Sequence, residues 1–134
     1  MPSFVCPLKR GKNMSKINVP DEFILSRGNQ KFIRFGGLLH VAHQMGNVSI
    51  KTEWVNKDSW DKENPFLVFK AEVCITDKDV MNVSTGYGDA STKNTGKMIW
   101  PHLLRMAETR AIVRALRFAT GISMTALEEL GGEE

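Results

Sequence analysis

The chain has 134 residues, 42% of them hydrophobic and 25% charged, which fits one globular domain and is short for two. It has no apolar run of membrane-spanning length, and its two cysteines, Cys6 and Cys74, share no metal-ligand spacing, which argues against a zinc site and favours a reducing, cytoplasmic location. The net charge of +3 is uneven, because residues 1–60 hold nine Lys and Arg against four Asp and Glu.

The first expected elements are a basic arm and a helix. Residues 1–25 combine prolines with four Lys and Arg, which is typical of a flexible arm, so we expect one domain over residues 26–134. Residues 30–45 carry apolar side chains at helical spacing, and Gly46 follows as a stop signal. A glycine pair weakens the start of this helix, so its firm part is expected to begin near Gly37.

Alternating apolar and polar residues predict three β-strands: residues 48–55, 66–76 and 81–88. The turn Asp77–Asp79 makes the second and third strands a hairpin. Gly86 and Gly88 flank Tyr87 in the third strand, which indicates a bulge or a close approach of another backbone.

A long helix is predicted from Trp100 to Gly121. Pro101 suits the first turn and Gly121 suits the C-cap. Thr125 and Glu128 form a potential capping box for a short final helix. The chain therefore predicts an α+β fold: a helix, a three-stranded antiparallel sheet, a long helix packed on the sheet in a β-β-β-α core, and a short C-terminal helix.

Three arginines on the long helix, Arg110, Arg114 and Arg117, recur at i, i+4 and i+7 and share one stripe of its surface. The residues from Thr109 to Ile122 include no acidic side chain, so the helix itself does not compensate the stripe. Arginine binds phosphate through two parallel hydrogen bonds. Phosphate binding is therefore favoured over the alternative of a solvated helix face.

The remaining side chains of this helix are interpreted as structural. Leu103, Met106 and Val113 border the stripe and imply a second contact surface, most simply with another subunit. Arg105 and Glu108 fall in or beside the apolar arc, so a charged pair, or a contact of Glu108 with a core donor, is expected.

Two motifs carry a family resemblance: Thr85–Gly88, TGYG, and Glu108–Arg117, ETRAIVRALR. On these motifs and their order, residues 30–121 resemble the single-strand annealing proteins of the Rad-fifty-two type, including their small phage relatives. The resemblance implies a β-β-β-α core that assembles into a ring or filament. It also implies a protein without catalytic activity or cofactor that binds single-stranded DNA in a basic groove and anneals complementary strands without ATP.

The resemblance also implies site residues. Arg114 and Arg117 match the groove arginines, whereas Val113 stands where the family often has a lysine, with Arg110 as the nearest substitute. Two lysines before the long helix match loosely a second, outer DNA contact: Lys93 and Lys97. Single-stranded DNA and further copies of the chain are the implied partners, with a single-stranded DNA-binding protein as a further candidate.

Residues on the strands are additional candidates for DNA contact. Lys51 and Lys70 lie on the non-core faces of neighbouring strands and would extend the stripe into a groove. The alternative is ordinary surface charge, paired with Glu53 and Glu72. Tyr87 is a candidate for stacking on a base, with packing against the hairpin as its alternative.

Three rival functions remain open. A double-stranded RNA-binding domain has the same order of elements, but its cations usually lie at the start of the final helix. A nuclease needs clustered carboxylates for metal ions, whereas Asp77, Asp79 and Asp89 fit a turn and a loop cap. A purely structural assembly protein would form oligomers without salt-sensitive DNA affinity.

Overall fold

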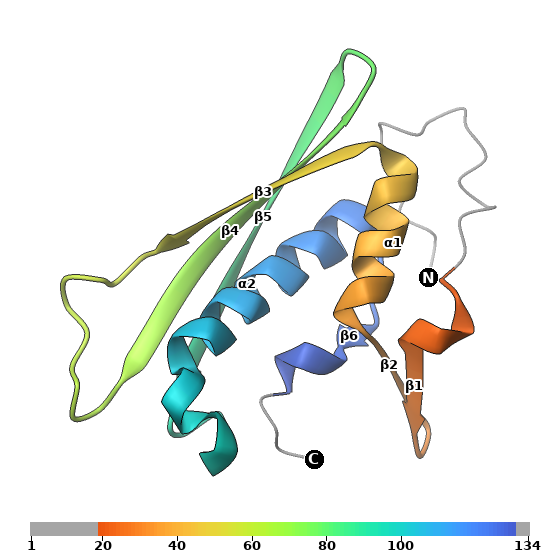
Figure 1. Cartoon of the computed structure of the whole chain (residues 1–134). Helices are drawn as coiled ribbons and strands as arrows, with labels where there is room; N and C mark the ends of the chain where they lie inside the picture. The colour runs from red at the N-terminus through yellow and green to blue at the C-terminus, as the bar shows by residue number, and fades with distance from the viewer. Residues whose placement is uncertain (1–18, 131–134) are drawn as a thin grey trace.

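The computed structural model describes residues 19–130, which form an α+β fold. Its main sheet is antiparallel, with the strand order β3 (Asn47–Trp54), β4 (Phe66–Asp77) and β5 (Val80–Ser91). Helix α2 (Leu103–Thr120) lies across one face of this sheet (Figure 1). The predicted fold class, including the long helix packed on three antiparallel strands, is confirmed.

A second, smaller sheet joins the two ends of the described chain. Strands β1 (Ile24–Arg27) and β2 (Gln30–Ile33) form an antiparallel hairpin, and β6 (Thr125–Ala126) pairs with β2 in parallel. A 3₁₀ turn, η3 (Asp21–Phe23), precedes β1, and helix α1 (Phe35–Met45) follows β2 and packs on α2. The C-terminal segment is thus held beside α1 although it is far away in sequence.

The expected first helix is wrong over residues 30–33, which form strand β2. Phe32 and Ile33 fit a helical spacing as well as a strand, and pairing with β1 on one side and β6 on the other selects the strand. Arg34 then has an extended backbone, and α1 begins at the next residue. Residues 21–25 of the expected arm form η3 and the start of β1, while residues 1–18 lie outside the described part of the chain.

The long helix ends where the sequence predicts, but it begins later than expected. Gly121 has φ 75° and donates its N–H to the Arg117 carbonyl, so the predicted C-cap is confirmed. Residues Lys97–His102, with Pro101 among them, form a 3₁₀ helix, η4, and the α-helix begins only at Leu103. Pro101 is therefore two residues before α2 rather than inside its first turn.

The expected final helix with a capping box is wrong. Thr125 lies in strand β6, and only a single 3₁₀ turn, η5 (Leu127–Glu129), follows. Glu128 instead accepts a hydrogen bond from the Phe35 backbone N–H at 2.9 Å, at the start of α1. Glu128 thus satisfies a backbone N–H in the first turn of α1 rather than one in a helix of its own segment.

Helix α2 and strand β5 approach each other at the level of their backbones. A Cβ atom at Gly86 would lie 2.8 Å from the Ala111 carbonyl oxygen, and one at Gly88 would lie 2.6 Å from the Ala107 carbonyl oxygen. Neither position has room for a side chain, and the alanines opposite keep the helix surface flat. The close approach expected at the two glycines is confirmed.

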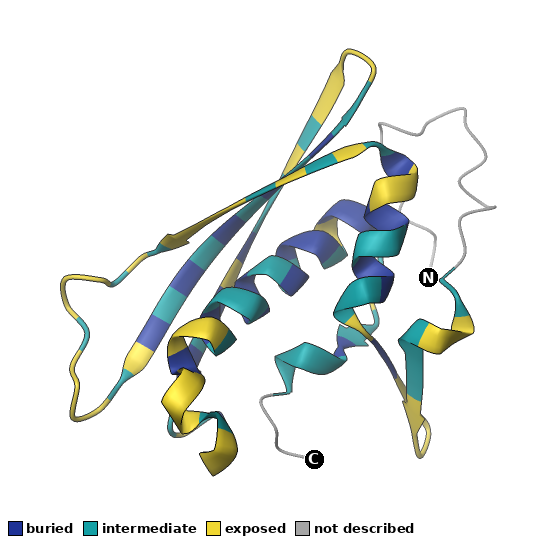
Figure 2. Ribbon diagram, viewed as in Figure 1, coloured by how far each residue is buried: buried dark blue, intermediate teal, exposed yellow. Residues whose placement is uncertain are grey.

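The hydrophobic core lies between the sheet and the two helices (Figure 2). Strand β4 contributes alternate side chains to it: Leu67, Phe69, Ala71, Val73 and Ile75. Leu103 and Val113 of α2 are 6% and 0% exposed, and α1 and η5 of the same chain pack against this helix. Helix α1 and η5 thus provide a second contact surface for α2 within the chain, and a contact of α2 with another subunit stays a prediction. No helix within residues 19–130 is long and apolar enough to cross a membrane.

Candidate nucleic-acid interface

The arginine stripe of α2 runs beside β5, which is an edge strand of the main sheet. Arg110 Nη1 donates to the Asp89 carbonyl oxygen at 2.8 Å, and Arg114 Nη1 donates to the Tyr87 carbonyl oxygen at 3.0 Å. The carbonyl groups on the outer side of an edge strand otherwise have only water as a partner. The stripe therefore provides hydrogen-bond donors for two backbone carbonyl groups of the β5 edge and places positive charge along that edge.

Arg110 is buried, with 5% of its surface exposed. Besides the Asp89 carbonyl, it donates to the Glu129 carbonyl at 2.9 Å and to the Asn94 carbonyl at 2.9 Å. Its Nη1 also donates to the Asn94 side-chain oxygen at 3.0 Å. This guanidinium joins α2, the loop after β5 and the C-terminal turn, so its surroundings are those of a structural residue rather than those of the predicted DNA contact.

Arg114 and Arg117 share one carboxylate. Glu129 Oε1 lies 3.2 Å from Arg114 Nε, and Glu129 Oε2 lies 2.9 Å from Arg117 Nη1. The arginine side chains stay 40% and 25% exposed, whereas that of Glu129 is 7% exposed. One negative charge thus meets two positive charges, and the exposed sides of both arginines keep a net positive charge.

Glu129 is the partner that the sequence pattern did not reveal. The helix has no acid of its own beside the stripe, but the chain turns back after Gly121 and brings this residue to it. The Ala126 backbone N–H donates to Glu129 Oε2 at 3.0 Å, which fixes the carboxylate in place. No local spacing could have indicated the contact, because it depends on the path of the C-terminal segment.

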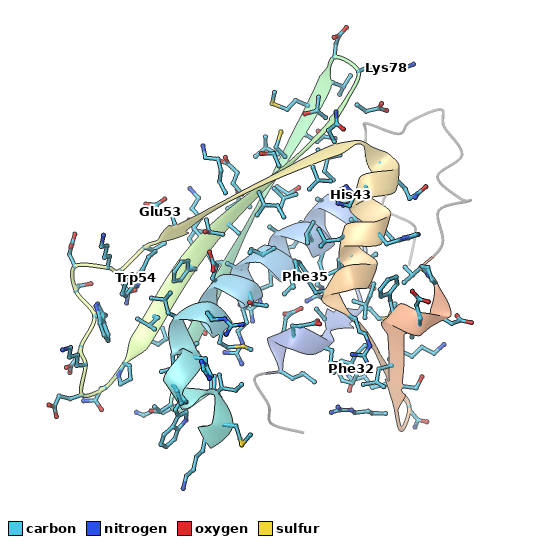
Figure 3. The ribbon with its side chains drawn as sticks, viewed as in Figure 1. Phe32, Phe35, His43, Glu53, Trp54 and Lys78 are labelled. Atoms are coloured by element: carbon cyan, nitrogen blue, oxygen red, sulfur yellow. The ribbon has the colours of Figure 1, made fainter. Side chains whose placement is uncertain are left out.

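Lys51 and Lys70 lie elsewhere, on the sheet face that α2 does not cover. In the strand register Lys51 is opposite Glu72, and Lys70 is opposite Glu53. Figure 3 shows Glu53 on the side away from the helix. The four charges alternate in sign across two strands, so the register favours ordinary surface charge over an extension of the stripe.

Tyr87 connects this open face with the arginine edge. Its side chain is 54% exposed and is opposite Lys70 in the register, while its carbonyl accepts the hydrogen bond from Arg114. The ring therefore projects from β5, the strand beside the arginine stripe of α2. This position suits stacking on a DNA base that points from the β5 edge toward the open sheet face. The exposure of the ring argues against the alternative, in which Tyr87 packs against the hairpin.

The two predicted loop lysines are exposed, and each has a different neighbour. Lys93 precedes Asn94, the residue that binds Arg110, and so lies at one end of the stripe. Lys97 begins η4, and its Nζ lies 6.0 Å from the centre of the Trp100 ring. The structure thus brings Lys93, Arg114 and Arg117 to the β5 edge and leaves Lys97 further along the loop.

Two other charged residues of α2, Arg105 and Glu108, lie outside the arginine stripe. Glu108 Oε2 accepts a hydrogen bond from the Thr52 hydroxyl at 2.7 Å, which ties α2 to β3. Thr52 is exposed, so the donor is a surface residue rather than the expected core donor. Arg105 is exposed, so it is not a member of a buried pair.

At the other end of the stripe lies a pocket that the sequence did not predict. Its volume is about 660 Å³, and it is lined by Ser84, Arg114, Arg117, Phe118, Gly121, Ile122 and Ser123. The Phe118 ring is 64% exposed. The helix ends at Thr120, two residues later, so the ring lies at the C-terminal end of α2.

The comparisons with known proteins identify no relative: no protein-family model matches the chain, and no curated protein matches it either. Within residues 19–130, no three His, Cys, Asp or Glu side chains gather as potential metal ligands. Cys74 has a free thiol on β4, and Cys6 lies outside the described residues. A function for this protein therefore has to be argued from the geometry of the β5 edge.

Proposed function

We propose that this protein binds single-stranded DNA along the β5 edge and anneals complementary strands without ATP. The observation that supports the proposal is the pair Arg114 and Arg117, which share one carboxylate while 40% and 25% of their side-chain surface stays exposed. Two arginines in a row suit successive phosphates of a flexible strand. Contacts of this kind hold the backbone and leave base edges free to pair, which annealing requires.

The proposed protein acts as a homo-oligomer, either a ring or a filament, in the cytoplasm. Within residues 19–130, the β5 edge of a single copy offers Arg114, Arg117 and Lys93 to the DNA backbone, so the affinity of one such edge for DNA is low. Copies placed side by side would bind one strand at several points, and each further contact is then intramolecular. The same arrangement would present the strand in an extended form to its complement.

Annealing of two complementary oligonucleotides, one with a fluorophore and one with a quencher, tests this proposal. The protein is expected to accelerate quenching without ATP and to leave both strands intact when Mg²⁺ is added. Unlabelled single-stranded DNA should compete for the protein, and duplex RNA should compete far less. Preferential competition by duplex RNA would favour a double-stranded RNA-binding domain, and oligomers that neither bind nor anneal DNA would indicate a purely structural protein.

A further inference from the structure

The pocket beside Phe118 adjoins the two exposed arginines. Its volume of about 660 Å³ lies within the range of about 300–1,000 Å³ that is typical of small-molecule sites. Phe118 and Ile122 give it apolar walls, and Arg114 and Arg117 line it as well. It thus combines, in one place, a surface for a flat apolar group and donors for an anion.

Phe118 is unusual among the apolar residues of α2. Its ring is 64% exposed, whereas Leu116 and Ala119 beside it are 0% and 7% exposed. An exposed aromatic ring next to cationic side chains is typical of sites that bind single strands, because the ring stacks on a base and the cations bind the phosphates. Charge complementarity therefore selects a nucleotide over an uncharged apolar partner.

We infer that this pocket holds one nucleobase of the bound strand, stacked on Phe118, while Arg114 and Arg117 bind the adjacent phosphates. The inference rests on the proposed function and specifies it further. Each copy of the chain would then hold one base out of the stack and leave the neighbouring bases free to pair. Affinity would depend on the presence of bases, and not on phosphates alone.

Equilibrium binding of the full chain to two labelled oligomers of equal length tests the inference: an oligothymidylate and a backbone of abasic sites. The wild type should prefer the oligothymidylate. Phe118→Ala should weaken that binding about tenfold, leave binding of the abasic oligomer unchanged and so remove the preference, whereas Phe118→Trp should retain it. Leu104→Ala is the matched control, because Leu104 is another exposed apolar residue of α2, at 41%, and lies away from the pocket.

Several outcomes would overturn the inference while leaving the proposed function intact. These are equal wild-type affinity for both oligomers, or an equal effect of Phe118→Ala on both. Sedimentation could also show that Phe118→Ala forms a smaller protein assembly than the wild type while its preference for the oligothymidylate is unchanged. That result would show that the pocket receives a neighbouring copy of the chain instead of a base. If the wild type binds neither oligomer, the proposed function itself fails. Circular dichroism of each variant verifies that it is folded.

Discussion

The three arginines of the stripe share one helix face but differ in what surrounds them. Arg110 is enclosed and donates to backbone and side-chain oxygens of three segments, whereas Arg114 and Arg117 are partly exposed and meet Glu129. Helical spacing identifies which residues share a face, but it does not reveal which end of that face another segment covers. The division into one structural and two exposed arginines follows from the path of the C-terminal segment.

Arg110→Ala is expected to destabilise the fold by about 3 kcal/mol, because it leaves several buried oxygens without a donor. Arg110→Lys should not restore stability, since one ammonium group cannot reach the same acceptors as a planar guanidinium. Urea unfolding followed by circular dichroism measures both effects. Arg114→Ala is the comparison and should cost less than about 1 kcal/mol, because Arg114 is 40% exposed and Glu129 keeps Arg117 as a partner. Equal losses for Arg110→Ala and Arg114→Ala would contradict the structural role of Arg110.

Glu129 competes with phosphate for the two exposed arginines. Glu129→Gln keeps the shape of the side chain and removes its charge, so we expect tighter binding of single-stranded DNA. The plot of log affinity against log salt concentration should become steeper by about 0.7, the contribution of one further phosphate contact. Glu128→Gln is the matched control, because Glu128 binds the Phe35 N–H and does not contact the stripe. If the two variants behave alike, the carboxylate of Glu129 is not the competitor.

At the scale of elements, α2 and β5 form the frame that holds the arginine edge. The two glycines of β5 let the helix backbone lie against the strand, and this contact sets how far Arg114 must reach to the Tyr87 carbonyl. The motif around Tyr87 therefore has a structural explanation in this chain. Its glycines position the helix, and its tyrosine remains exposed at the edge.

Gly88→Ala should destabilise the protein by about 1–3 kcal/mol, since the added methyl group would press on the α2 backbone. Thermal unfolding measures the loss, and Thr85→Ala, on the open face of the same strand, should cause a much smaller change. A neutral Gly88→Ala variant would show that the helix does not lie as close to β5 as the structure indicates.

The sequence predicted those elements whose signal is local. The alternation in β3, β4 and β5 and the apolar arc of α2 each lie within a single segment, so their periodicity is sufficient to predict them. Strand β2 was missed, because its four residues become a strand only by pairing with β1 and with β6, about ninety residues away. In the candidate site the arginine stripe was local and was found, whereas Glu129 and the exposure of Phe118 depend on contacts between distant segments.

At the scale of the whole molecule, the described domain has one edge with exposed arginines and one sheet face with alternating charges. The alternating face attracts a polyanion only weakly, because each lysine is opposite a glutamate. Binding is therefore expected to follow the β5 edge, with the strand passing Lys93, the two arginines and the pocket at Phe118. Side-by-side copies would extend this path from one edge to the next.

The salt dependence of single-stranded DNA binding tests this account most directly. Arg114→Ala combined with Arg117→Ala should weaken binding of a labelled oligothymidylate, and should reduce the slope of log affinity against log salt concentration by about 1.4, the value for two phosphate contacts. Lys57→Ala combined with Lys62→Ala removes equal charge from the loop between β3 and β4 and should leave the slope nearly unchanged. A folded arginine double variant with wild-type affinity and slope would contradict the assignment of the β5 edge as the DNA-binding surface.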